Sequence, residues 1–392
     1  MSRRGRRDVV VVGGGVVGAA CALSLSQLDL DVALVEAAEP APWVPDRRDL
    51  RVYAFAPDNV ALLDGFGGWQ PVRAARAHPY RRMRVWDAAG GGELAFDADA
   101  LGRRELGWIV EHSLLVDRLW TALQTSGVHL RCPARVESLR QDEAGVELRL
   151  DDGSRLSGDI AIAADGADST LRGLVGIPVS DHDYAQRGIV AYVATERPHE
   201  DTAWQRFLPA GPLAFLPCTE GLSSIVWTLP EDEAQRMLAL DDDAFSQALT
   251  RAFDARLGRV RPVSTRVGFP LRRRLAGAHA SGRVLLLGDA AHVVHPLAGQ
   301  GVNIGLRDVA SLAVAVTEAQ QRRVDWASPS RLRRWSRMRR SEGVLAARTF
   351  DAINGAFSNE HPLATLLRGP LLGLAGRVPP VGRALWRRAA GV

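Results

Sequence analysis

The sequence predicts an α/β protein with a parallel sheet, interleaved with an α+β domain built on an antiparallel sheet, and a helical segment at the C-terminus. Three observations support this fold class. A short apolar strand, a glycine-rich turn and a helix open the chain. Two later apolar strands run into polar turns, and the middle of the chain alternates apolar and polar residues. Strands that alternate with helices predict parallel pairing, whereas alternation with Pro and Gly breaks predicts antiparallel strands.

The first element is a βαβ unit. Residues 8–12 form an apolar strand, residues 16–28 have helical spacing, and residues 32–35 form a second strand that ends at Glu36. The turn before the helix reads G-x-G-x-x-G. In this context the motif is the fingerprint of a Rossmann-like dinucleotide-binding domain. The basic start and apolar run also resemble a signal peptide, but the glycine spacing and the second strand favour the βαβ unit.

Each glycine of this motif has a physical task. Gly13 permits the tight turn, Gly15 lets a pyrophosphate approach the amides of the helix N-terminus, and Gly18 allows close helix–strand packing. Glu36 is expected to accept hydrogen bonds from the adenosine ribose hydroxyls. The motif predicts a dinucleotide and leaves NAD and FAD as alternatives.

Two further strands end in acidic turns. The strand at residues 159–164 runs into Asp165 and Gly166, and a helix is expected to begin near Ser169. The strand at residues 283–287 runs into "GDAAHVVHPLAGQGVNIGLRD", residues 288–308, which contains Asp289 and the start of a long helix. Open α/β sheets bind ligands at the carboxyl ends of their strands, so both turns are candidate ligand contacts.

Two histidines in this last segment could suggest a metal site. His292 and His295 are three residues apart, a spacing that can present two ligands. No third ligand stands nearby, and Gly and Pro interrupt the regular helix that such a pair requires. The sequence therefore predicts no metal, and it favours a loop histidine satisfied by backbone for His292. The role of His295 is left open by this reasoning.

Composition excludes several classes of chemistry. All 49 basic residues are arginine, which excludes Schiff-base enzymes and P-loop enzymes because both require lysine. The three cysteines form no CxxC pair, so neither a zinc site nor a disulfide framework is supported, and a reducing cytoplasm fits. The net charge of +4 does not require a nucleic-acid partner. Apolar stretches long enough to span a membrane are absent from the sequence.

Taken together, the three turn motifs resemble those of the group A FAD-dependent aromatic monooxygenases, which have the para-hydroxybenzoate hydroxylase fold. Within that family the long form of residues 288–308 is similar to the ubiquinone-biosynthesis hydroxylases. Further stretches match this subfamily in type and order, namely residues 49–69, 226–230, 269–276 and 357–380.

The resemblance implies one noncovalent FAD. The ADP half would be held by the glycine turn and Glu36, the ribityl chain by Asp289, and the flavin pyrimidine edge by backbone at the start of the last long helix. His112 occupies a position where relatives often carry an amide. The implied cofactor residues are Gly13, Gly15, Gly18, Glu36, Arg51, His112, Asp165, Gly166, Asp289, Gly301, Val302 and Asn303.

The resemblance also implies a reaction. The flavin would hydroxylate the aromatic ring of a polyprenylphenol intermediate of ubiquinone biosynthesis through a 4a-hydroperoxide. His295 and Pro296 are the candidates for the wall nearest the reactive flavin edge. A second nucleotide-binding βαβ unit is not visible, so NAD(P)H would bind transiently as electron donor. Two alternatives stay open: a related hydroxylase of a soluble or secondary metabolite, and a non-oxygenating flavoprotein such as a prenyl-chain reductase or a scaffold.

The cofactor motifs divide the chain into an interleaved pattern. The alternating middle region would form an antiparallel sheet over the flavin, with Phe215, Pro217 and Trp227 as candidate substrate contacts, although plain sheet core explains each equally well. Residues 231–253 read as one outer helix with an acidic start. The predicted domains are an FAD-binding domain of residues 1–71, 105–180 and 268–350, a substrate domain of residues 72–104 and 181–267, and a C-terminal helical segment of residues 351–392.

The C-terminal segment is basic and amphipathic. From residue 361 onward it contains five arginines and no acid. Such a segment can lie on an anionic membrane or contact a ubiquinone-biosynthesis complex, and docking on the body of the protein is an equal alternative. The sequence therefore predicts a cytoplasmic protein that can lie peripherally on the inner face of the membrane.

Overall fold

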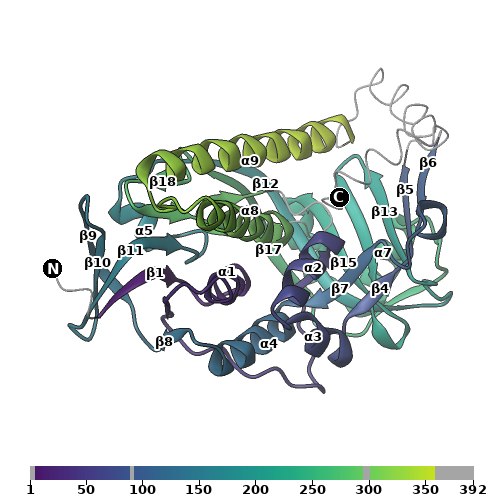
Figure 1. Cartoon of the computed structure of the whole chain (residues 1–392). Coiled ribbons are helices and arrows are strands. Elements are labelled where there is room, and N and C mark those ends of the chain that lie inside the picture. Colours follow the sequence, from purple (N-terminus) through teal and green to yellow (C-terminus); the bar gives the residue numbers. More distant parts are fainter. Residues whose placement is uncertain (1–4, 89–91, 295–300, 358–392) are drawn as a thin grey trace.

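The computed structural model describes residues 5–88, 92–294 and 301–357 (Figure 1). One sheet has the spatial order β18-β19-β11-β1-β2-β8, with β10 and β9 paired beside β11. The five strands from β19 to β8 run parallel. The strands of this sheet are β1 (Arg6–Val12), β2 (Val32–Val35), β8 (His129–Arg131), β9 (Val136–Gln141), β10 (Val146–Leu150), β11 (Arg155–Ala163), β18 (Ala280–Ser281) and β19 (Val284–Leu286).

The register of the parallel strands brings their carboxyl ends to one edge. Val12 lies opposite both Val35 and Ala163, and Ala163 lies opposite Leu286. The residues that follow these four strand ends therefore come together, although the sequence separates them by more than 250 residues. This edge carries the candidate site.

Helices pack against this sheet and against the edge formed by the carboxyl ends of its parallel strands. Helix α1 packs against α4 and α8, and Figure 1 shows α9 lying along the outside of α8. Buried Leu and Val side chains join α1, α4, α8 and the sheet in one core. The helices of this half of the molecule are α1 (Val16–Ser26), α2 (Pro57–Gly65), α3 (Trp69–Ala75), α4 (His112–Thr125), α8 (Gly301–Gln321) and α9 (Pro329–Phe357). Helix α5 (Thr170–Leu174) packs against β9, and its Leu171 belongs to the core on the opposite face of the sheet.

A second sheet lies at the other end of the molecule (Figure 1). Its order is β20-β17-β12-β15-β14-β13-β5-β6, with β16 beside β12. Neighbouring strands are antiparallel except β13 and β5. The strands are β5 (Arg82–Asp87), β6 (Glu93–Asp97), β12 (Val179–Thr195), β13 (Thr202–Leu208), β14 (Gly211–Pro217), β15 (Leu222–Pro230), β16 (Val260–Pro262), β17 (Val267–Ala276) and β20 (His292–Val293).

A small sheet, β3-β7-β4, completes the fold. Its side chains pack with Tyr192 and Leu216 of the large antiparallel sheet, so it joins the two halves of the molecule. Its strands are β3 (Val52–Phe55), β7 (Gly107–Glu111) and β4 (His78–Tyr80), and the short 3₁₀ turns are η1 (Asp99–Leu101), η2 (Thr219–Gly221) and η3 (Gly288–Ala290).

The structure corrects one expected element. Residues 231–253 form two helices, α6 (Glu231–Ala239) and α7 (Asp242–Ala252), instead of one. Leu240 has an extended backbone, and the side chain of Asp241 accepts a hydrogen bond from the amide of Ala244. An Asp at this position caps a new helix, which ends the preceding one.

The division into domains stays a prediction, and two elements cross its boundaries. Strand β17 begins at Val267 and lies in the large antiparallel sheet, although most of it falls in the expected FAD-binding domain. Helix α9 is continuous from Pro329 to Phe357, across the expected boundary at residue 351. Among the described helices, none has the length and apolarity required to cross a bilayer.

Candidate functional site

The glycine turn between β1 and α1 is shaped by close backbone contacts. Gly13 has φ +106°, and a Cβ there would lie 2.3 Å from the carbonyl oxygen of Ala164. A Cβ at Gly18 would lie 1.9 Å from the carbonyl oxygen of Gly13. Only glycine therefore fits at these two positions.

Gly15 differs from its two neighbours. It is exposed, and a Cβ at this position would meet nothing within 4 Å. It is the N-cap of α1 and supplies no side-chain cap to the first amides of the helix. The helix start is thus an open group of N–H donors, which is the arrangement that binds a phosphate.

Glu36 follows β2 and faces the same turn. Its Oε2 accepts a hydrogen bond from the amide of Gly14 at 2.5 Å, and its Oε1 accepts from the amides of Ala37 and Ala38 at 2.7 and 3.2 Å. A carboxylate has about four acceptor positions. Glu36 therefore fixes the glycine turn and retains acceptor capacity for a ribose hydroxyl.

The second turn contributes a buried oxygen. Oδ2 of Asp165 accepts from the amide of Leu171 at 3.1 Å, whereas Oδ1 is buried and has no hydrogen-bond partner among the described residues. Gly166 has φ +85° and open space at its Cβ position. A buried acceptor that lacks a protein donor fits a hydroxyl of a ligand or a water.

The third turn carries Asp289 within η3. Gly288 has φ +59°, and a Cβ there would lie 3.1 Å from a methyl carbon of Val17 in α1. Asp289 is half-buried, and its carboxylate accepts no hydrogen bond from any described residue. Its charge raises the pKa of the nearby Tyr53, adding to the larger effect of burial. Asp289 is thus an available acceptor at the sheet edge.

A polar group from the small sheet lies beside this turn. The hydroxyl of Tyr53 and Nδ1 of His112 are 2.9 Å apart, and the Arg51 guanidinium lies 5.4 Å from the centre of the Tyr53 ring. Burial, aided by the charge of Arg51, lowers the pKa of His112 to about 4. His112 is therefore a neutral ring at pH 7, and Arg51 is the exposed positive charge of this group.

Asn303 anchors the first turn of α8. Its Oδ1 accepts from the amide of Ala56 at 2.9 Å and from Nδ2 of Asn59 at 2.8 Å, and its own Nδ2 donates to Ala54 at 2.8 Å. The side chain thus ties α8 to β3 and α2. Any cofactor contact at Gly301, Val302 and Asn303 would come from backbone, as the resemblance implies.

An ion-pair network behind the third turn was not expected from the sequence. Asp308 is fully buried and binds His292 Nε2 and Arg339 Nε, each at 2.7 Å. His292 therefore has a charged side chain as its partner and is not a loop histidine satisfied by backbone. A signal was present in the sequence, because Asp308 stands four residues from both Ile304 and Leu312 on the apolar face of α8.

The expected catalytic pair, His295 and Pro296, lies outside the described residues. Their placement near a flavin therefore stays a prediction.

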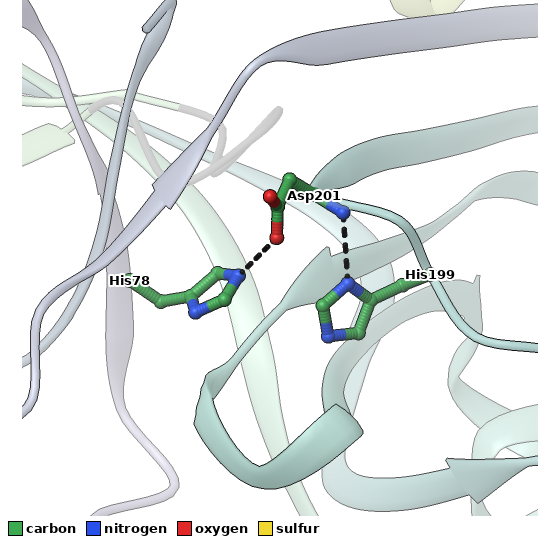
Figure 2. A group of neighbouring side chains, drawn as sticks. All are labelled: His78, His199 and Asp201. Atoms are coloured by element: carbon green, nitrogen blue, oxygen red, sulfur yellow. Dashed lines mark hydrogen bonds and ion pairs between the residues drawn. The ribbon is translucent and has the colours of Figure 1, made fainter.

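One group within the described part of the chain has the composition of a metal site. Figure 2 shows His78, His199 and Asp201, with His78 Nε2 3.0 Å from Asp201 Oδ1. Nδ1 of His199 accepts the amide hydrogen of Asp201 at 3.1 Å, so its Nε2 donates to the carbonyl oxygen of Cys218. Both ring nitrogens of His199 are thus used in hydrogen bonds. This arrangement favours a hydrogen-bonded link over a metal site.

The expected substrate residues lie in β14 and β15. Phe215 is stacked on Phe253 with ring centres 3.8 Å apart, and Trp227 packs near Phe245, both under α6 and α7. Pro217 is buried on the same side of β14. Substrate contact by these residues stays a prediction. Their packing favours a core role, and the opposite face of the sheet presents Tyr192, Leu216 and Val226.

The described residues of the site fit a dinucleotide. They supply an open helix N-terminus at Gly15, a carboxylate with remaining acceptor capacity at Glu36, the unpartnered Oδ1 of Asp165 and the free carboxylate of Asp289. All follow strands whose carboxyl ends share one edge, where α/β proteins bind such ligands.

Comparisons with known proteins agree with this geometry. Residues 6–347 match the family described as "FAD binding domain". The chain is 36% identical over 387 residues to 3-demethoxyubiquinol 3-hydroxylase of Escherichia coli (strain K12), covering 98% of both chains. It is 36% identical over 386 residues to ubiquinone hydroxylase UbiL of Rhodospirillum rubrum, covering 98% of this chain and 89% of the relative.

Solved structures agree on the fold. The p-nitrophenol 4-monooxygenase PnpA from Pseudomonas putida DLL-E4 superposes with a TM-score of 0.77, at 23% identity, over 97% of this chain and 96% of that one. At this identity the likeness shows the fold alone.

Proposed function

Because the chain belongs to the FAD-binding family matched by residues 6–347 and is an FAD-dependent monooxygenase, we propose that it hydroxylates the aromatic ring of a polyprenylphenol intermediate of ubiquinone biosynthesis. The observation that carries the proposal is the likeness over 98% of both chains to a hydroxylase of 3-demethoxyubiquinol. The three ligand-facing turns at one sheet edge support it, because they are the parts that the cofactor requires.

Bound FAD supplies the redox chemistry: it accepts electrons from a donor and activates dioxygen for transfer to the ring. The protein binds and orients this cofactor. The amides at Gly15 hold the pyrophosphate, Glu36 the adenosine ribose, and Asp289 the ribityl hydroxyls. Arg51 balances the negative charge of the cofactor, and His112, neutral at pH 7, adds a hydrogen-bonding ring without charge. Asp165 and Gly166 would lie near the pyrophosphate and the path of the donor, for which NAD(P)H is proposed as a transient ligand.

The reacting end of the site is proposed from the sequence. His295 and Pro296 would form the wall nearest the reactive flavin edge. Phe215, Pro217 and Trp227 are kept as candidate substrate contacts. The alternative candidates are Tyr192 and Val226, on the face of the large antiparallel sheet opposite α6 and α7. An electron-rich ring bearing an apolar chain is the proposed substrate.

We also propose that the protein is cytoplasmic and lies peripherally on an anionic membrane. Residues 322–392 carry 14 arginines and 4 acidic residues, whereas residues 1–321 carry 35 arginines and 41 acidic residues. Positive charge is therefore concentrated in α9 and the C-terminal segment. Anionic lipids attract such segments by about 1 kcal/mol per arginine near the surface.

The outer face of α9 supports this location. Arg333, Arg334, Arg337 and Arg340 are exposed and form no ion pair with a described residue, and Met338 between them is 46% exposed. Their spacing of three, four and seven residues places them on one side of the helix. A basic face with exposed apolar side chains is typical of helices that lie on a membrane surface. The alternative proposal for this face is contact with a ubiquinone-biosynthesis complex.

The function is tested in a strain that lacks this gene. Mass spectrometry of its quinone pool should show loss of ubiquinone and accumulation of a precursor that lacks one ring oxygen. The wild-type gene should restore the product, and the purified holoenzyme should hydroxylate the extracted precursor with NAD(P)H and dioxygen. A normal quinone pool in the deletion strain, or turnover to peroxide without a hydroxylated product, would contradict the proposal.

A further inference from the structure

The two aspartates near the ends of the segment of residues 288–308, Asp289 and Asp308, have opposite environments. Asp289 is half-buried and accepts no hydrogen bond from a described residue, whereas Asp308 is fully buried and holds three donors. We propose that Asp308, together with His292 and Arg339, is the positioning device that fixes the turn of Asp289 for the cofactor. This inference rests on the FAD site proposed above and does not depend on which substrate is hydroxylated.

The contact that links the two acids is a backbone bond. Oδ2 of Asp308 accepts the amide hydrogen of Gly288 at 2.9 Å, and Gly288 directly precedes Asp289. The same oxygen binds His292 Nε2 at 2.7 Å, three residues after Asp289. One carboxylate oxygen therefore grips the turn on both sides of the ligand-facing acid.

The second carboxylate oxygen of Asp308 connects the turn to helix α9. Oδ1 of Asp308 binds Nε of Arg339 at 2.7 Å, and Arg339 also pairs with Glu342 within α9. A Cβ on Gly343 would lie 3.6 Å from Cδ2 of His292, so α9 covers the histidine closely. The network thus joins α8, α9 and the turn from three directions.

Helices α1 and α8 pack closely on the turn of Asp289 and restrict its position. A Cβ at Gly305 would lie 2.7 Å from Val17 of α1 and 3.1 Å from Cα of Gly288. The turn is therefore enclosed between α1 and α8, and Asp308 sets its position within that space. A displacement of about 1 Å at such a ligand-binding residue weakens a site substantially.

The charges of the network support its persistence at neutral pH. Burial raises the pKa of Asp308, but His292 and Arg339 outweigh burial and hold the pKa below its usual range. The pKa of His292 is raised above its usual range. Burial lowers this pKa, but the larger opposing effect comes from Asp308, and Asp289 adds to it. The other groups that face this histidine are Arg339 and His279, and burial lowers the pKa of His279 to about 4. A buried pair of this kind is strongly destabilised when one partner is removed.

A double-mutant cycle separates positioning from general stability. The variants are Asp289→Asn, Asp308→Asn and the double variant, each purified as full-length holoenzyme. FAD affinity is measured by dilution, from the recovery of flavin fluorescence. Each single change should raise the dissociation constant about tenfold or more, equivalent to about 1.4 kcal/mol. If Asp308 acts through Asp289, the double variant should lose at most about threefold beyond Asp289→Asn. Losses that multiply would overturn the proposal.

A destabilised control excludes an effect through folding alone. Phe253→Leu removes packing beneath α6 and α7, far from the sheet edge in sequence and in its contacts. It should lower the melting temperature as Asp308→Asn does, with an unchanged FAD dissociation constant. An equal loss of FAD affinity in Phe253→Leu would contradict a specific role for Asp308.

A second variant guards against an Asp308→Asn protein that does not fold. Arg339→Gln retains Asp308 and its bond to Gly288, and should give a smaller loss of affinity with the same non-additivity toward Asp289→Asn. Full additivity in this cycle would equally overturn the proposal. These results stand apart from the proposed reaction, which would be contradicted by a holoenzyme that has normal FAD affinity and yields no hydroxylated quinone precursor.

Discussion

The guanidinium of Arg172 donates to the carbonyl oxygen of Ala290 at 2.9 Å, and its other nitrogen donates to the carbonyl oxygen of Ala167 at 2.8 Å. Arg172 lies in α5, directly after the Asp165 turn, and Ala290 directly follows Asp289. One side chain therefore connects the second and third ligand-facing turns through a bond between residues that are 118 positions apart in the sequence.

Replacement of this arginine should weaken the cofactor site. Arg172→Leu removes both bonds and leaves two carbonyl oxygens without their donor, at a cost of about 1–3 kcal/mol. We expect a lower melting temperature and a several-fold weaker binding of FAD, measured by calorimetry and by fluorescence on dilution. Arg149→Leu is the matched control, because Arg149 forms an exposed pair with Glu137. Equal behaviour of the two variants would argue against the connection.

Two glycines of the first motif should respond differently to alanine. Gly15→Ala adds a methyl group into open space at φ −68°, so the protein itself should tolerate it. Binding of FAD should fall about tenfold, because the methyl group would occupy the place of the pyrophosphate. Gly18→Ala places the methyl group 1.9 Å from a backbone oxygen and should destabilise the fold by about 1–3 kcal/mol. Tight FAD binding by Gly15→Ala would show that the pyrophosphate lies elsewhere.

His112 should contribute a pH-dependent term to stability. Its pKa is about 4 in the folded chain and near 6.5 when unfolded. Between these values the unfolded state binds a proton that the folded state does not, so this contribution is present above pH 6.5 and is lost as pH falls toward 4. His112→Gln should therefore show a shallower fall in melting temperature over this window. His279, with a similar shift, accounts for part of the slope that remains. Parallel curves for both proteins would contradict the assignment.

The basic face of α9 should determine membrane binding. The triple variant Arg333→Gln, Arg334→Gln and Arg337→Gln should sediment more than tenfold less well with vesicles containing phosphatidylglycerol, at about 1 kcal/mol per arginine. A control triple of the exposed residues Arg131, Arg135 and Arg140 to Gln makes the same change in net charge. The control should bind as the wild type does. Equal losses in both triples would indicate an effect of net charge alone, and binding to neutral vesicles would exclude an electrostatic site.

Local patterns in the sequence predicted the first βαβ unit closely. The strand at Val32–Val35 has the expected bounds, and α1 begins at Val16 as its glycine spacing predicts. Ser169 accepts the amide hydrogen of Arg172 and caps a helix where one was expected. These features depend on residues within a few positions of each other, so sequence spacing was sufficient.

Features that depend on distant residues could not be obtained this way. Asp308 pairs with Arg339, which lies in the next helix, α9. It also pairs with His292, which precedes it by 16 residues. The alternation of β14 identified two faces, but both are buried, so the pattern could not show which face α6 and α7 cover. The sequence therefore predicted the strand and left its substrate-facing side undetermined.

The parallel pairing of β19 with β11 has a consequence for biogenesis. The edge that receives FAD is complete only when β19, the turn of Asp289 and Asp308 have joined strands made much earlier. A nascent chain must therefore clear the ribosome past residue 308 before it can retain the cofactor, and until then β11 lacks its neighbour β19. Flavin acquisition is consequently a late event in translation, and a ribosome-arrested fragment that ends before β19 should emerge without colour.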